Sequence, residues 1–207
     1  MCSRFENKET GLSVFQSLKK NFKGEFILED LEELKKINIA PTNKILTVIP
    51  KTGEFKISST NWGIKFEEKA PVIFNTRIET IIEKKYWNNV FKSNRCLIPA
   101  TAFYEWVPVK GKKIPHRISL TNEELFFFPS IIVKKDDLIM SSIITTEPNK
   151  FMKDVHRRMP TILKLKDSLK FLEAKPEAAL EMCEPLDDNE KMKIEVAEDL
   201  IKKESVK

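Results

Sequence analysis

Short β-rich segments fill the middle of the chain and constrain its fold more than any other feature. Five of them, separated by proline or charged turns, follow one another at residues 95–100, 102–109, 116–120, 125–133 and 138–145. Two further strands are predicted at residues 44–49 and 54–58, around a Thr52-Gly53 turn. A β-rich middle of this kind, flanked by helices, predicts a largely antiparallel, barrel-like sheet in an α+β fold.

The flanking helical patterns lie at residues 12–20, 28–38, 79–91, 150–155, 166–173 and 176–183. In the second of them, Leu28, Leu31 and Leu34 recur at helical spacing. We therefore expect a single α+β domain over residues 1–185. A highly charged C-terminal tail, residues 186–207, is predicted to be helical or loose.

The composition excludes several classes of protein. A chain of 207 residues that is 41% hydrophobic can bury one substantial core, and it contains neither a membrane-spanning apolar run nor a signal-peptide core. Three widely separated cysteines, Cys2, Cys96 and Cys183, argue against a disulfide framework and predict a cytoplasmic location. Two histidines without a C-x-x-C motif and five scattered glycines predict neither a metal site nor a nucleotide cofactor.

Cys2 is the first candidate catalytic residue. Its small side chain permits removal of Met1, which leaves a free amine and a thiol on adjacent carbons. Such a 1,2-aminothiol can condense with an aldehyde to an imine, which the thiol closes to a five-membered thiazolidine. Alternatively, the thiol is the nucleophile and the amine serves as its base. With a reference pKa of about 7.7–8.0, roughly a tenth of the amine is unprotonated at pH 7. The plain alternative is a frayed terminus.

Glu105 is the second candidate, because it stands in an apolar and aromatic run, Phe103-Tyr104-Glu105-Trp106-Val107. On a strand, Phe103, Glu105 and Val107 share one face. A carboxylate on an apolar face is costly unless paired, and desolvation would raise its pKa into the range of a general acid or base. Equally, Glu105 would be exposed if Tyr104 and Trp106 pack inward.

His156 and Asn75 complete the candidate catalytic set. His156 lies between Asp154 and two arginines and could shuttle protons near neutral pH, or be a surface or structural histidine. Asn75 could orient a substrate or the amine through its side-chain amide, although an Asn before a helix is more often a cap or turn residue. His116 has no companion motif and is assigned a structural role.

Basic and aromatic residues suggest a nucleic-acid partner. The net charge is +5, and only six of the 36 basic residues are arginine. Arginine binds phosphate bidentately, so Arg4, Arg77 and Arg158 are candidate phosphate contacts. Trp62 and Trp106 could stack on bases. Each has a plain alternative as a surface ion pair or a core aromatic.

These residues fall in short motifs that occur together in one order. They are Met1-Cys2-Ser3-Arg4-Phe5, Trp62-Gly63, Asn75-Thr76-Arg77-Ile78-Glu79-Thr80, Arg95-Cys96-Leu97-Ile98-Pro99, Phe103-Tyr104-Glu105-Trp106, Thr145-Thr146 with Asn149, and His156-Arg157-Arg158-Met159-Pro160. In order and spacing they resemble the SRAP family, the SOS response-associated peptidase fold of abasic-site processing proteins. The resemblance spans about residues 1–172.

The resemblance implies an α+β fold around a barrel-like sheet with a groove for single-stranded DNA. It also implies that Cys2, exposed by loss of Met1, forms a thiazolidine with the ring-opened aldehyde of an abasic site. Asn75, Glu105 and His156 match the other active-site positions of the family. Three residues depart from its pattern, Ser3 and Ala102 in place of Gly and Pro148 in place of Ala, and the stretch between Trp62 and Asn75 is short.

The leading interpretation is a monomeric protein that covalently captures abasic sites in single-stranded DNA, with no cofactor. A second interpretation is a thiol peptidase, either general or only autoproteolytic, with Cys2 as nucleophile and His156 or Glu105 as base. That scheme leaves the arginines Arg4, Arg77 and Arg158 unexplained. In a third, the chain is a non-catalytic nucleic-acid binding module in which Cys2 is incidental.

Overall fold

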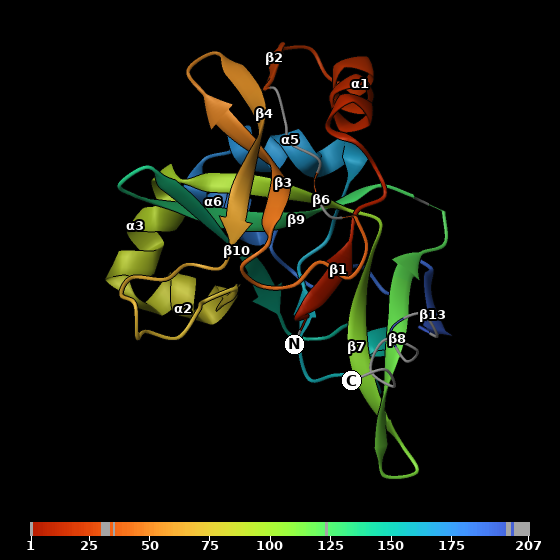
Figure 1. Ribbon diagram of the computed structural model, residues 1–207. Helices are drawn as coiled ribbons and strands as arrows, with labels where there is room; N and C mark the ends of the chain where they lie inside the picture. Colours follow the sequence, from red (N-terminus) through yellow and green to blue (C-terminus); the bar gives the residue numbers. More distant parts are fainter. Residues whose placement is uncertain (1, 30–33, 35, 123, 198–199, 201–207) are drawn as a thin grey trace.

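A closed five-stranded β-barrel forms the centre of the protein in the computed structural model (Figure 1), which describes residues 2–29, 34, 36–122, 124–197 and 200. Its strands are β3 (Lys44–Lys51), β4 (Glu54–Trp62), β6 (Arg95–Ala100), β9 (Phe126–Lys135) and β10 (Leu138–Thr146). They pair in the order β10-β4-β3-β6-β9, and β9 pairs back with β10 to close the ring. Only the β4–β10 pairing of this ring is parallel. The predicted α+β class with a largely antiparallel, barrel-like sheet is confirmed.

Four short strands extend the barrel sheet at its edges. They are β2 (Glu25–Leu28), β5 (Asn75–Arg77), β11 (Met159–Pro160) and β12 (Leu163–Lys164). β5 runs parallel to β10, so that Asn75 lies opposite Ile143. β11 pairs with the same end of β10, where Thr145 lies opposite Pro160. Two segments that are far apart in the sequence therefore meet at the end of β10.

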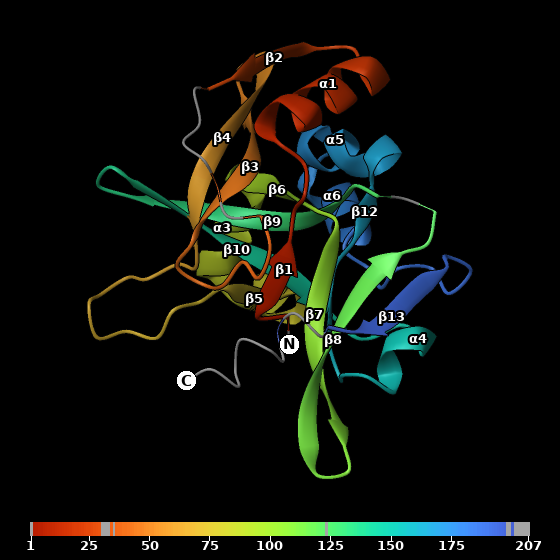
Figure 2. The ribbon, with the colours of Figure 1, turned by 45° about the vertical axis from the view of Figure 1, so that its right-hand side comes forward.

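A second, four-stranded sheet stands beside the barrel, in the order β1-β7-β8-β13. Its strands are β1 (Arg4–Glu6), β7 (Ala102–Val109), β8 (Lys112–Leu120) and β13 (Met192–Val196). The β7–β8 hairpin projects away from the barrel, and β1 lies along β7 in both ribbon views (Figures 1 and 2). Because β6 leads almost directly into β7, the chain passes from the barrel into the second sheet at Thr101.

Helices cover the barrel on the side away from this hairpin (Figure 1). They are α1 (Gly11–Asn21), α2 (Ile78–Glu83), α3 (Lys85–Ser93), α5 (Leu165–Glu173) and α6 (Pro176–Glu181). A further helix, α4 (Lys150–Lys153), lies near β13 instead (Figure 2). α1 begins where the Thr10 hydroxyl accepts a hydrogen bond from the Ser13 amide, and lysines in its last turn suit its negative end. α5 and α6 agree with the predicted helices at residues 166–173 and 176–183.

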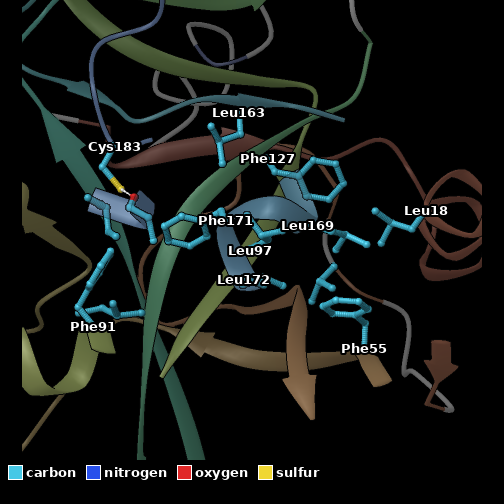
Figure 3. Close-up of a cluster of buried hydrophobic side chains, with 14 of the residues drawn as sticks. Leu18, Phe55, Phe91, Leu97, Phe127, Leu163, Leu169, Phe171, Leu172 and Cys183 are labelled. Carbon is cyan, nitrogen blue, oxygen red and sulfur yellow. Dashed lines mark hydrogen bonds between the residues drawn. The ribbon is translucent and has the colours of Figure 1, made fainter. Parts of the chain in front are cut away.

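The larger hydrophobic core lies between the barrel and these helices (Figure 3). Leu18 of α1, Phe55 of β4 and Phe171 of α5 are among its buried side chains. A smaller core joins the barrel to the second sheet, and it contains Cys2 and Phe5 at the N-terminus. Each fully buried Leu or Phe contributes about 1.5–3 kcal/mol. The two cores thus hold the helices against one side of the barrel and the second sheet against another.

Three predicted elements differ from the structure. The helix predicted at residues 79–91 is two helices, because Lys84 between α2 and α3 has an extended backbone with φ −98° and ψ 114°. In the helix predicted at residues 28–38, Leu28 instead ends strand β2, and Leu31 lies outside the described residues. In the predicted tail, residues 192–196 form strand β13 by pairing along its whole length with β8, and Met192 is its buried residue.

Candidate active site

Cys2 lies two residues before strand β1, where it is only 1% exposed. The following strand, β1, pairs with β7 so that Arg4 lies opposite Tyr104 and Phe5 opposite Phe103. The Cys2 thiol donates a hydrogen bond of 3.3 Å to the Arg4 carbonyl. Ser3 beside it is not among the residues with positive φ, so the departure from Gly causes no backbone strain. Cys2 is therefore held in place, and the alternative of a frayed terminus is wrong.

Asn75 holds Cys2 from the barrel side. Its side-chain amide donates a hydrogen bond of 2.8 Å to the Cys2 carbonyl. The cap of α2 is Arg77, which makes no side-chain capping bond, so Asn75 is not a helix cap here. Asn75 Oδ1 is buried and has no hydrogen-bond partner among the described residues. The predicted orienting role of Asn75 is thus directed at the main chain of Cys2.

Trp62 supports Asn75 rather than facing solvent. It is fully buried, and its indole N–H donates a 2.9 Å hydrogen bond to the carbonyl of Phe74, the residue before Asn75. The next residue is Gly63 at φ +123°, where a Cβ would come within 2.3 Å of Val72. The prediction that Trp62 stacks on bases is wrong, because a buried indole offers no face. The Trp-Gly motif is structural and fixes the segment that leads to Asn75.

Glu105 is buried at 4% exposure on β7, in the neighbourhood of Cys2 and His156. Tyr104 is buried on the other face of the strand, in a small cluster with Ala197 and partly buried Trp106. Both faces of β7 are therefore covered, and the interpretation of Glu105 as a buried carboxylate is confirmed. Burial raises the pKa of Glu105 above its usual range, while the charge of His156 opposes the rise.

His156 follows α4 and lies half-buried beside Glu105. Its main-chain amide donates to the Met152 carbonyl at 2.8 Å. Its Nδ1 lies 3.0 Å from both the amide nitrogen and the carbonyl oxygen of Arg158. Accepting from the amide would leave the ring proton on Nε2. The segment that carries His156 thus fixes the ring through Nδ1.

The Cys2 thiol is poorly suited to exist as a free thiolate in this environment. Burial raises the pKa of Cys2 far above its usual range, and the negative charge of Glu105 raises it further. A nucleophilic cysteine usually has a lowered pKa, beside a cation or at a helix N-terminus. The resting site therefore holds a neutral thiol next to a carboxylate.

Arg158 is engaged inside the protein. Its guanidinium makes a bidentate pair with Glu79, at 2.5 and 2.9 Å, and donates to the Thr145 carbonyl at 2.7 Å. This pairing holds the pKa of Glu79 below its usual range. In the structure Arg158 forms an ion pair that joins α2 to the His156 segment, and the phosphate contact through Arg158 stays a prediction. Pairing with a carboxylate leaves the guanidinium less free for phosphate.

The other predicted DNA contacts differ in how far their side chains are exposed to solvent. Arg77 is exposed at the start of α2, two residues after Asn75. Arg4 is partly buried, and its guanidinium donates to the Ser3 carbonyl at 2.7 Å. Trp106 is partly buried and retains some open surface. Of the five predicted DNA contacts, Arg77 is the most accessible cation, and Trp62 is the one excluded by burial.

Three residues of the site region were not predicted from the sequence. Glu79 enters the sequence analysis only as a member of the Asn75–Thr80 motif. The signal that could have identified its role is its negative charge, which complements the positive charge of Arg158. Thr145 has a buried hydroxyl with no hydrogen-bond partner in the described part of the chain. It lies opposite Arg77 where β5 meets β10. Glu6 is a buried carboxylate in an otherwise ordinary strand pattern, which gives no sequence signal.

Three other titratable groups lie outside the predicted catalytic set, and one of them, His116, is the cross-strand neighbour of Glu105. Cys96 and Cys183 are buried in the strand and helix layers, where burial raises the pKa of both thiols. His116 bonds to the Ile114 carbonyl at 2.9 Å. The described residues contain no group of three His, Cys, Asp or Glu side chains placed to bind a metal. None of their helices is long and apolar enough to span a membrane.

The fold and the site define a class of α+β protein with a buried cysteine at its N-terminus, beside an asparagine, a carboxylate and a histidine. The family model described as SOS response associated peptidase (SRAP) matches residues 1–203. The chain belongs to the SRAP family. The match extends through β13, beyond the span of the motifs.

Similar proteins agree with this assignment. The chain is 37% identical to Abasic site processing protein YoaM of Bacillus subtilis (strain 168) over 174 residues, 79% of this chain and 75% of YoaM. It is 34% identical to Abasic site processing protein YoqW of the same organism over 201 residues, 90% of this chain and 88% of YoqW. A crystal structure of a protein from Bacteroides thetaiotaomicron is similar in fold, with a TM-score of 0.75 at 21% identity, over 97% of this chain and 94% of that chain.

Proposed function

We propose that this protein processes abasic sites by crosslinking to them covalently through Cys2 in single-stranded DNA. Relatives that align over most of the chain are named abasic site processing proteins. The observation that carries the finer proposal is the placement of Cys2. Its carbonyl is held by Asn75, and its thiol lies in the field of Glu105. The chemistry requires hydrolysis of the Met1–Cys2 peptide bond, which frees the α-amine of Cys2.

The bond changes balance without an oxidant or a reductant. The Cys2 amine adds to the aldehyde carbon of the ring-opened sugar, and loss of one water leaves an imine. The thiol sulfur then bonds to the imine carbon, the C=N π electrons move to nitrogen, and the thiol proton ends on that nitrogen. The product is a thiazolidine that joins the protein to the sugar.

The electrostatics of the site favour this order of steps. Because burial and Glu105 raise the pKa of the Cys2 thiol, the amine is the better first nucleophile. A raised pKa brings Glu105 towards the range in which it can accept a proton from the amine and return one to the departing water. His156 is assigned to the sugar oxygen, which must gain a proton as the ring opens. Asn75 Oδ1 and the Thr145 hydroxyl are buried polar groups available to the substrate.

The DNA contacts follow from accessibility. Exposed Arg77 and partly buried Arg4 are proposed to bind phosphates that flank the abasic position, and Trp106 to contact a neighbouring base. A single strand is proposed because Cys2 is recessed, and a duplex would have to release the sugar to reach it. The protein is proposed to act as a monomer in the cytoplasm, without a cofactor.

The competing activity is a thiol peptidase with Cys2 as nucleophile. That mechanism needs a thiolate, activated by a base or a lowered pKa. The surroundings of Cys2 act in the opposite direction, because burial and a neighbouring carboxylate both favour the neutral thiol. The imine route uses the amine first and tolerates a neutral thiol. The electrostatics thus favour crosslinking over peptide cleavage.

The test is the intact mass of the protein before and after mixing with an abasic-site oligonucleotide. The free protein should have lost one methionine, and the mixture should gain the mass of the oligonucleotide minus one water. Cys2→Ala and Cys2→Ser should give no stable adduct, whereas Cys96→Ser and Cys183→Ala should still give it. Full activity with Met1 retained, or a stable crosslink by Cys2→Ala, would refute the mechanism.

A further inference from the structure

A second buried carboxylate, Glu6, lies on the N-terminal strand four residues after Cys2. It is 2% exposed and ends strand β1. Its Oε2 accepts a hydrogen bond of 2.6 Å from the Tyr104 hydroxyl. Its Oε1 accepts from Arg117 Nη2 at 2.6 Å, from Arg117 Nε at 3.0 Å and from the Thr101 hydroxyl at 3.3 Å. One carboxylate therefore binds side chains from β7, from β8 and from the residue that precedes β7.

These partners lie on the reverse side of the strand that carries Glu105. Tyr104 and Glu105 are neighbours on β7, so their side chains point to opposite faces. Arg117 is paired with Tyr104 across the β7–β8 ladder, as His116 is with Glu105. The Glu6 network and the candidate active site thus cover the two faces of the same stretch of β7.

β1 needs such an attachment because it is short. It has three residues, and its register with β7 places Glu6 opposite Ala102 and Arg4 opposite Tyr104. On its other side, Phe5 forms an isolated bridge to Ile39. Cys2 lies beyond the paired residues. Its position relative to Glu105 therefore depends on how firmly β1 is held against β7.

Electrostatics make the attachment strong. Burial alone would raise the pKa of Glu6, but hydrogen bonds from Arg117 and Tyr104 outweigh burial and hold the pKa below its usual range. Glu6 is therefore ionised at neutral pH, and hydrogen bonds to a charged group are shorter and stronger than neutral ones. The attachment is also directional, because Arg117 presents two N–H groups to one oxygen.

We propose that Glu6, with Tyr104 and Arg117, positions strand β1 on β7 so that the reacting end of Cys2 stays beside Glu105. Glu6 is a positioning residue, since the side chains that the structure places against its carboxylate are those of Tyr104, Arg117, Thr101 and, at 3.6 Å, Lys8, and none of these is a candidate catalytic residue. The inference rests on the proposed crosslinking function. The inference is that the Glu6 network increases the rate of crosslinking, in addition to stabilising the fold.

The experiment is a double-mutant cycle on single-turnover crosslinking to a saturating abasic oligonucleotide. Glu6→Gln keeps the size of the side chain and removes its charge, and it is measured alone and together with Glu105→Gln. Since small misplacement of reacting groups costs up to about 100-fold in rate, Glu6→Gln alone should slow crosslinking roughly 10- to 100-fold. In the Glu105→Gln background it should cause little further loss, because the Cys2–Glu105 alignment no longer matters there.

Two more variants control for effects on the fold. Tyr104→Phe removes one hydroxyl and keeps the ring, so it should slow crosslinking less than Glu6→Gln does. In the Glu105→Gln background, Tyr104→Phe should likewise cause little further loss of rate. Glu195→Gln weakens the outer contact of Arg117, at 3.8 Å, and the surface ion pair of Glu195 with Lys193, and it should react at the wild-type rate because it leaves Glu6 and its hydrogen bonds in place. Thermal melting of each variant shows whether it is folded. If Glu6→Gln is unfolded, Tyr104→Phe carries the test.

The outcomes separate this inference from the proposed function. Equal fold losses in the wild-type and Glu105→Gln backgrounds would show that Glu6 serves stability alone and would overturn the inference. Wild-type rates in folded Glu6→Gln and Tyr104→Phe would do the same while leaving Cys2-dependent crosslinking intact. Failure of the wild-type protein itself to crosslink would instead overturn the proposed function, and this inference with it.

Discussion

The side chain of Asn75 binds the main chain of Cys2, through a 2.8 Å hydrogen bond from Nδ2 to the Cys2 carbonyl. The bond joins the first residue of β5 to a residue two positions before β1, across 73 positions of sequence. Together with the Glu6 network it holds the N-terminus from two sides. The nucleophile is therefore held through its main chain by Asn75 and through its thiol by the long hydrogen bond to the Arg4 carbonyl.

Replacement of Asn75 should slow crosslinking more than it reduces DNA affinity. Asn75→Asp keeps the shape but removes the donor and sets a carboxylate against the Cys2 carbonyl, so it should be slower than Asn75→Ala. Each loss should be roughly 10- to 100-fold, as for misplaced reacting groups. Single-turnover rates measure the first quantity, and binding to undamaged single-stranded DNA measures the second. Equal effects on both would place Asn75 among the DNA contacts.

Arg77 and Arg158 should behave differently, although both are arginines in motifs that meet through the Arg158–Glu79 ion pair. Arg77 is exposed, so Arg77→Ala should weaken single-stranded DNA binding by roughly 1–3 kcal/mol and flatten its salt dependence. Arg158 is paired with Glu79, so Arg158→Ala should lower the melting temperature and leave the salt slope unchanged. Binding across a salt series, in a Cys2→Ala background, separates the two. A flattened slope in Arg158→Ala would return that residue to the phosphate contacts.

The contribution of Glu6 to stability should depend on pH with a definite sign. Its pKa in the folded protein lies below the value of 4.5 expected for the unfolded chain. Its stabilising effect is therefore fully present above that pH and is lost as pH falls through the lowered pKa. Wild type should thus be more stable than Glu6→Gln at pH 7, and the difference should shrink below about pH 4.5. Urea unfolding of both proteins from pH 3 to pH 7 tests this. A difference that stays constant over the range would mean that Glu6 is not ionised in the fold.

Much of the architecture could be predicted because the signals are local. The strands around the Thr52-Gly53 turn and the successive strands after Arg95 are marked by turn residues and β-rich composition, and they lie where expected. The break at Lys84 could not be seen, since Lys is a good helix former and the break shows only in the extended backbone of Lys84. Strand β13 was missed because its sequence is charged and its pairing with β8 is distant.

In the candidate site, too, some residues could be predicted from local sequence and others depend on contacts between distant segments. Cys2, Asn75, Glu105 and His156 were predicted from residue chemistry and motif, and the structure places Cys2 beside Asn75 and Glu105, and Glu105 beside His156. Trp62 was wrongly predicted as a stacking platform, because an aromatic side chain in a motif serves equally well in a core. The partner of Arg158 and the network of Glu6 depend on contacts between distant segments, which no local pattern encodes.

The last prediction divides the proton transfers between Glu105 and His156. An abasic sugar is mostly a closed ring, so a proton must reach its oxygen before the aldehyde is exposed, and others must leave the amine and reach the departing water. We assign the first transfer to His156 and the second pair to buried Glu105. Glu105→Gln and His156→Ala should each slow crosslinking by roughly 10²–10⁴-fold without preventing the final adduct.

The two variants should differ in their response to substrate and to pH. A pre-opened aldehyde analogue bypasses ring opening, so it should rescue His156→Ala more than Glu105→Gln. Because burial raises the pKa of Glu105 and its base form is the active one, the wild-type rate should rise with pH through that raised pKa. Glu105→Gln should lose this rise and keep only the later one due to the amine, whose reference pKa is about 7.7–8.0. Single-turnover crosslinking on both substrates across pH decides the assignment. Equal rescue of the two variants, or an unchanged pH profile in Glu105→Gln, would refute it.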